Sequence, residues 1–186
     1  MRVRDHLALS TAGAALLYPW FGQRVVSGWA ASILIDVDHY LWFVTRKRSV
    51  NPIAAVRYFN KPQPPHSSNV RLFHKPLVLL VVGMLSTRWR ALLPVALGMT
   101  AHVAMDAYHD ERLKQAHAAA LLRDKFTCQV CGTRDDSVTA HLKQQPALLP
   151  SYATANLITL CGSCHEDAHA GRAPSSRVRV QIRRRI

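Results

Sequence analysis

Four cysteines in two pairs are the first residues whose type and spacing could do chemistry. Cys128 and Cys131 are two residues apart, as are Cys161 and Cys164, and the chain has no other cysteine. Each pair places two thiolates on a tight turn, and four thiolates make a closed tetrahedral site that stabilises a small fold. We therefore predict a structural zinc here. This spacing favours metal over two disulfides and places this half of the chain in the reducing cytoplasm.

Histidine and asparagine side chains accompany the cysteine pairs. His141 and Asn156 lie between the pairs, and His165 and His169 follow them. Two histidines four residues apart on a helix face the same way and could grip one divalent ion. Neutral imidazole suits metal binding or proton transfer near pH 7, because its ordinary pKa is about 6.5. A zinc-binding module without catalysis is the alternative interpretation.

The order and spacing of these residues, over residues 122–171, closely resemble the HNH endonuclease family. The resemblance implies a small α+β fold of the ββα-metal type, with a hairpin carrying the central histidine and a helix beginning near the second cysteine pair. It implies that His141 is the general base, that Asn156 orients it, and that His165 and His169 hold a catalytic divalent ion such as magnesium, manganese or nickel.

One position departs from the family's pattern. The residue before the base is usually Asp or His and helps to bind the catalytic metal, whereas here it is Ala140. Two outcomes follow from the resemblance. Either the metal depends on His165 and His169, or the domain binds DNA without cutting it.

The chain is strongly basic. Its 24 Lys and Arg against 11 Asp and Glu give a formal net charge of +13, which favours a polyanionic partner, either DNA or an anionic membrane surface. Basic residues near the cysteine and histidine motif, and in a basic C-terminal arm over residues 172–186, are candidates for phosphate contacts. They are Arg123, Lys125, Lys143, Arg183, Arg184 and Arg185.

The first 110 residues have a different composition, with four apolar segments at residues 7–20, 25–44, 77–85 and 91–107. Residues 25–44 are long enough to cross a bilayer as one helix. If all four segments span, the basic loop between the second and third lies on the same side as both termini. The positive-inside rule then places both termini in the cytoplasm, at a bacterial-type inner membrane. A soluble helical domain in the cytoplasm is the alternative.

Acidic and histidine side chains lie within these apolar segments or just before them, and those within the segments are costly unless paired or bound to metal. They are His6, Asp36, Asp38, His39, His74, His102 and Asp106. The D-x-D-H and H-x-x-x-D patterns resemble a family of inner-membrane proteins described as metal-dependent hydrolases. The resemblance implies a second zinc or similar ion held by some of these residues.

Together these observations predict an α-helical, four-helix membrane domain over residues 1–110, a linker helix over 111–122, an HNH domain over 123–171 and the basic arm. The function expected from the resemblance is a membrane-tethered endonuclease that hydrolyses DNA phosphodiester bonds. Two alternatives stay open. One is an inactive, zinc-dependent nucleic-acid-binding module on a membrane anchor, and the other is a membrane hydrolase whose activity lies in residues 1–110.

Overall fold

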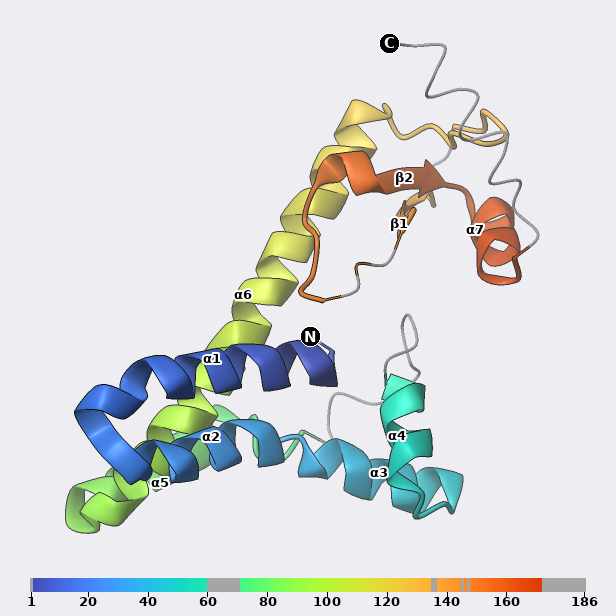
Figure 1. The fold of residues 1–186 in the computed structure, drawn as a ribbon. Coiled ribbons are helices and arrows are strands. Elements are labelled where there is room, and N and C mark those ends of the chain that lie inside the picture. The colour runs from blue at the N-terminus through green and yellow to red at the C-terminus, as the bar shows by residue number, and fades with distance from the viewer. Residues whose placement is uncertain (1, 60–70, 135–136, 145, 147, 172–186) are drawn as a thin grey trace. The chain divides into compact units, whose positions relative to one another are not determined.

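The computed structural model describes residues 2–59, 71–134, 137–144, 146 and 148–171. The chain divides into two compact units, Met1–Tyr108 and His109–Ile186. Most described residues are helical, and the second unit adds a two-stranded sheet (Figure 1). The second unit also contains four clustered cysteines. These features confirm the coarse prediction of a helical chain with a small mixed domain. The basic arm over residues 172–186 lies outside the described residues.

The first unit begins with a helical hairpin. Helix α1 (Val3–Phe21) ends at Gly22, whose φ of 57° suits a residue without a side chain, and the short helix η1 (Gly22–Arg24) leads into α2 (Val25–Leu34). Two polar contacts join the hairpin: the Ser10 and Ser32 hydroxyls lie 2.8 Å apart, and the Trp29 indole donates to the Thr11 hydroxyl.

The prediction that residues 25–44 form one membrane-spanning helix is wrong. The chain breaks at Ile35 and Asp36 and resumes as α3 (Val37–Lys47), which is followed by α4 (Pro52–Phe59). At about 1.5 Å per residue, the ten residues of α2 extend only about 15 Å, half the thickness of a bilayer core. The break turns the carboxylate of Asp36 toward the other polar side chains of this unit.

The third and fourth apolar segments form α5 (Pro76–Arg88) and, after the short helix η3 (Arg90–Leu92), the first part of α6 (Leu93–Arg123). The expected linker helix over residues 111–122 is therefore not a separate element but the second half of α6. Among the described residues, one stretch, Arg90–Arg123, is long and apolar enough to cross a membrane. The finer prediction of four spanning helices stays a prediction.

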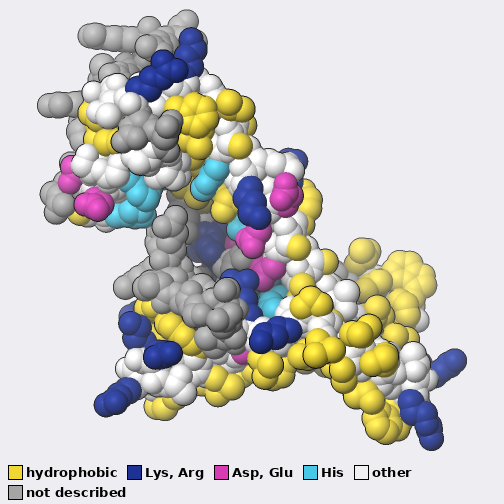
Figure 2. Space-filling view, turned by 180° about the vertical axis from the view of Figure 1, so that it is seen from behind, with side chains coloured by type: hydrophobic (Ala, Val, Ile, Leu, Met, Phe, Trp, Pro, Cys, Tyr) yellow, Lys and Arg dark blue, Asp and Glu magenta, His cyan; other side chains and the backbone are white. Residues whose placement is uncertain are grey.

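The first unit buries polar side chains and exposes apolar ones. Asp5, His6, Asp38 and His102 are at most 4% exposed, whereas Trp20 is 72% exposed. Figure 2 shows hydrophobic side chains gathered over a wide part of this unit's surface. A protein surrounded by water usually buries its apolar side chains, so this distribution is unfavourable for a surface in contact with water.

Helices α2 and α6 approach closely at two glycines. A Cβ atom built on Gly98 would lie 2.0 Å from the carbonyl oxygen of Gly28, and one built on Gly28 would lie 2.8 Å from that of Pro94. Neither position has room for a side chain, and small residues of this kind let helix backbones pack tightly.

The second unit packs a hairpin between two helices. Strand β1 (Thr139–Leu142) pairs antiparallel with β2 (Leu157–Leu160), which follows the short helix η4 (Thr154–Asn156) and precedes α7 (Gly162–His169). Ala140 and Leu157 pack against Ala116 and Ala120 of α6. The opposite face of the sheet carries Ile158, which joins a core of cysteines and aliphatic side chains that includes Ala168 of α7.

Candidate metal centres

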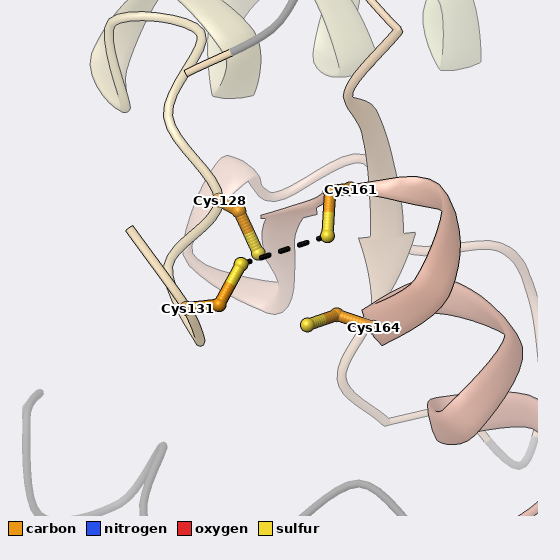
Figure 3. Close-up of side chains that lie close together, drawn as sticks. All are labelled: Cys128, Cys131, Cys161 and Cys164. Carbon is orange, nitrogen blue, oxygen red and sulfur yellow. Dashed lines mark hydrogen bonds between the residues drawn. The ribbon is translucent and has the colours of Figure 1, made fainter. Parts of the chain in front are cut away.

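The four cysteine thiols converge on one point (Figure 3). Cys128 and Cys131 come from the turn that follows α6, Cys161 caps the start of α7 and Cys164 lies in its first turn. All four are free thiols whose sulfurs lie within 4.8 Å of one another, and Cys131 and Cys161 Sγ are 3.6 Å apart. Zinc with Zn–S bonds of about 2.3 Å needs tetrahedral sulfurs about 3.8 Å apart. The cluster could therefore hold a zinc ion, as predicted.

Local hydrogen bonds already prepare this cluster for metal. The thiol of Cys131 lies 3.2 Å from the Thr133 hydroxyl, and hydrogen bonding to Thr133 lowers the pKa of Cys131 to about 6. Burial, together with the neighbouring thiols, raises the pKa of Cys164 to about 12. A cation at the centre would reverse the second effect, because thiolates are the metal-binding form.

A second group brings together three histidines. His141 projects from β1 toward His165 and His169 of α7, with ring centroids 5.0 and 4.8 Å away, and the two α7 rings are 4.6 Å apart. One nitrogen from each ring lies within 4.8 Å of the others, so the three could share one ion. Burial, followed by the positive charge of the neighbouring imidazoles, lowers the pKa of His141, and the same two causes lower that of His165. Both shifts favour the neutral form of the ring.

Asn156 holds the loop after β1 in place. Its side-chain oxygen accepts from the Gln144 backbone N–H at 3.1 Å and its amide donates to the Gln144 carbonyl at 2.8 Å. The Lys143 ammonium donates to the Ala155 carbonyl, which adds a third link across the same loop. The Asn156 side chain therefore fixes the backbone of the loop that follows His141.

Two of the predicted phosphate-contacting residues are used inside the unit. The Arg123 guanidinium pairs with Asp124 and donates to the carbonyls of Thr154 and Leu157. Lys143 makes the loop contact described above, while Lys125 lies in the turn after α6 with a left-handed φ of 51°. Arg183, Arg184 and Arg185 lie outside the described residues. Arg123 is thus better explained as a structural residue than as a nucleic-acid contact.

The seven acidic and histidine residues singled out in the first unit also come together. His102 Nε2 and His74 Nε2 are 3.2 Å apart, and Asp36 Oδ1 lies 3.4 Å from each. Asp106 Oδ2 is 3.6 Å from His102 Nε2 and 3.9 Å from His74 Nε2. Ligands of a tetrahedral ion with bonds of about 2.0–2.2 Å lie about 3.3–3.6 Å apart. Two overlapping sets, His74 with His102 and Asp106, and His6 with Asp36 and His102, each bring three ligand atoms within 4.8 Å of one another and could hold an ion.

The outer hydrogen bonds fix which ring nitrogens face the centre as acceptors. His102 Nδ1 lies 2.6 Å from the Ser32 carbonyl oxygen, which can only accept, so Nδ1 carries the proton. His74 Nδ1 lies 3.3 Å from the Asp38 carboxylate and is protonated for the same reason. In the neutral rings both Nε2 atoms then present lone pairs to each other and to two carboxylates. A cation between these groups, either a proton on one ring nitrogen or a metal ion, would relieve their repulsion, and the outer hydrogen bonds are typical of metal-binding histidines.

The remaining three residues lie around this group. Asp38 also accepts from His39 Nδ1 at 2.8 Å, and His6 Nε2 lies 3.0 Å from Asp106 Oδ1 with its ring stacked on that of His102. His6 Nδ1 is buried and has no hydrogen-bond partner among the described residues. His6 also offers a ligand atom within 4.8 Å of those of Asp36 and His102, and Asp38 and His39 do so together with Asp36.

Sequence reasoning missed the backbone that supports this centre. Ser32 supplies the carbonyl that orients His102, and the Gly28–Gly98 approach brings α2 and α6 together one turn earlier in each helix. The signal was present as small residues spaced four apart, Gly28 and Ser32, opposite Gly98 and His102.

Comparisons with models of protein families, with curated proteins and with solved structures found no match to this chain.

Proposed function

We propose that this chain is a membrane-associated, metal-dependent endonuclease. The observation that carries the proposal is the convergence of His141, His165 and His169 on one point, next to a four-cysteine cluster that could hold a structural zinc. The resemblance of residues 122–171 to HNH endonucleases supplies the reaction class, hydrolysis of a DNA phosphodiester bond.

The chain's own residues would divide the work between support and chemistry. The cysteine cluster ties the turn after α6 to the start of α7, and so fixes α7 against β1. Asn156 secures the loop beside His141, and His141, His165 and His169 each present a ring nitrogen toward one point. A divalent ion held there would stabilise the negative charge that develops on the phosphate during hydrolysis.

Plasmid nicking tests the proposal. The purified full chain is expected to convert supercoiled DNA to the open circle only with added divalent metal. His165→Ala is expected to lower the rate about 100-fold or more. His117→Ala is the matched control, because His117 is a half-buried histidine of α6 outside the cluster. Nicking that survives His165→Ala would refute the proposal. Unchanged DNA binding without any nicking by the wild type would favour the inactive nucleic-acid-binding alternative.

Membrane association is proposed from the first unit. Its exposed apolar side chains, its buried polar ones and the helix Arg90–Arg123 suit a lipid environment better than water. With the positive-inside rule, the second unit would face the cytoplasm. Fractionation tests this part: the chain is expected to stay in the membrane pellet at high pH and to need detergent for release.

A second candidate function, metal-dependent hydrolysis in the first unit, rests on a separate observation. Asp36, His74, His102 and Asp106 converge with the geometry of an ion's ligands. Metal analysis tests it: Asp36→Asn is expected to remove one ion per chain and to leave the cysteine-bound zinc in place. An unchanged metal content would rule this centre out.

A further inference from the structure

We infer that His141 is the third ligand of the ion held by His165 and His169, and that the site selects zinc-like transition metals over magnesium. The resemblance to HNH endonucleases implies instead that His141 is a general base. The inference rests on the proposed function only for what the ion is used for, and the binding itself can be measured without nuclease activity.

The alternation of side chains along β1 is the first argument. Ala140 pairs with Thr159 and faces α6, where it packs with Ala116 and Ala120. His141 pairs with Ile158 and lies on the face of the sheet that carries Ile158. Ala168 of α7 packs against the core that contains Ile158, so this face is turned toward α7. Adjacent strand residues point to opposite faces of a sheet. An Asp or His at position 140 would therefore point away from His165 and His169, and position 141 is the one that reaches them.

The surroundings of His141 are the second argument. The nearest ring neighbours of His141 are the two imidazoles of α7, with ring centroids 5.0 and 4.8 Å from its own. Three imidazoles edge to face, each with a nitrogen within 4.8 Å of the others, are arranged as ligands of one ion.

The identity of these ligands determines the class of metal. Three neutral nitrogen donors suit zinc, cobalt or nickel, whereas magnesium requires oxygen donors. The described residues contribute no carboxylate to this group. A lone pair of His141 that is bound to the ion could not also accept a proton, so the ligand role excludes the general-base role for that nitrogen.

Cobalt binding to the zinc-containing full chain tests the inference. The bound Co²⁺ is counted by metal analysis and by its visible absorption. We expect His141→Ala and His165→Ala each to remove the same single equivalent, with at least about tenfold weaker binding. The double variant is expected to remove no more than either single variant, and His117→Ala to match the wild type. Excess Mg²⁺ is expected to leave the Co²⁺ bound.

Three results would overturn the inference: wild-type Co²⁺ binding by His141→Ala, a double variant that loses more than either single variant, or displacement of Co²⁺ by Mg²⁺. His141→Gln serves as a second variant that keeps a polar side chain on β1, and retention of the cysteine-bound zinc shows that each variant is folded. If the wild type binds Co²⁺ as expected but cuts no DNA, the ligand assignment stands and the endonuclease proposal fails.

Discussion

Gly98→Ala is a small change that should reach the candidate metal centre of the first unit without touching a candidate ligand. The added methyl carbon would lie 2.0 Å from the Gly28 carbonyl oxygen, whereas ordinary contacts begin at 3.4 Å. Helices α2 and α6 must therefore separate locally by about 1.4 Å. Overpacking of this kind typically costs about 1–3 kcal/mol of stability.

The separation should also loosen His102. His102 follows Gly98 by one helical turn, and Ser32 follows Gly28 by one turn, so the same movement lengthens the 2.6 Å bond from His102 Nδ1 to the Ser32 carbonyl. Lengthened by about 1.4 Å, that bond is lost. Removing an outer hydrogen bond from a metal-binding histidine typically weakens metal affinity about 10- to 100-fold.

The assay is zinc affinity by chelator competition, with urea unfolding of the detergent-solubilised chain alongside. Gly83→Ala is the matched control, because Gly83 lies in α5 and a Cβ there meets nothing within 4 Å. That control should be neutral or about 0.5–1 kcal/mol more stable. Equal zinc affinity and stability in the two variants would refute the reasoning from the helix contact.

Further predictions concern the second unit. Cys131→Ser is expected to lose the structural zinc and to unfold β1, β2 and α7, because zinc binding by four-cysteine sites contributes on the order of 10 kcal/mol. Amide hydrogen exchange would detect this unfolding. Protected amides in a zinc-free variant would contradict the prediction. Arg123→Ala is expected to destabilise this unit by about 1–3 kcal/mol in chemical unfolding, since it removes hydrogen bonds to Thr154 and Leu157, while DNA binding changes little. We also expect the stability of this unit to depend on pH through Asp124. Burial alone would raise the pKa of Asp124, but hydrogen bonds from Arg123 and Thr159 lower it below the usual value. The ionised carboxylate therefore stabilises the unit fully above about pH 5, and this stabilisation is lost as the pH falls toward the folded pKa. Asp124→Asn should remove that part of the acid sensitivity, and an unchanged acid-unfolding curve would contradict the assignment.

Residue type and spacing were sufficient to predict which side chains gather. The two CxxC pairs indicated one four-cysteine cluster. Polar residues within the apolar segments, together with His6 and His74 just before two of them, indicated an ion site made of some of these residues, because such groups are unfavourable within apolar segments unless paired or bound to metal. Both gatherings are present in the structure. Residues far apart in the chain, such as His6 and Asp106, were assigned to one group by this energetic argument together with the resemblance to a membrane hydrolase family.

Local geometry could not be predicted in the same way. The break at Ile35 and Asp36 lies within an apolar run whose composition predicts one continuous helix. At this break Asp36 contacts histidines from two other segments, His74 and His102, and these contacts are not evident from the sequence. The face taken by His141 depends on the register of β1 with β2, which is set by packing against α6 and α7. Arg123 looked available to phosphate because a sequence does not reveal the two carbonyls to which it donates.

The endonuclease claim is tested most directly by the cleavage of supercoiled plasmid DNA with one preparation of the full chain, first stripped of loosely bound metal and then supplied with Zn²⁺, Co²⁺ or Mn²⁺. The account predicts no nicking without metal, nicking after metal is added, and its loss in His165→Ala. Metal-independent nicking, or nicking of equal rate in His165→Ala and His117→Ala, would contradict it.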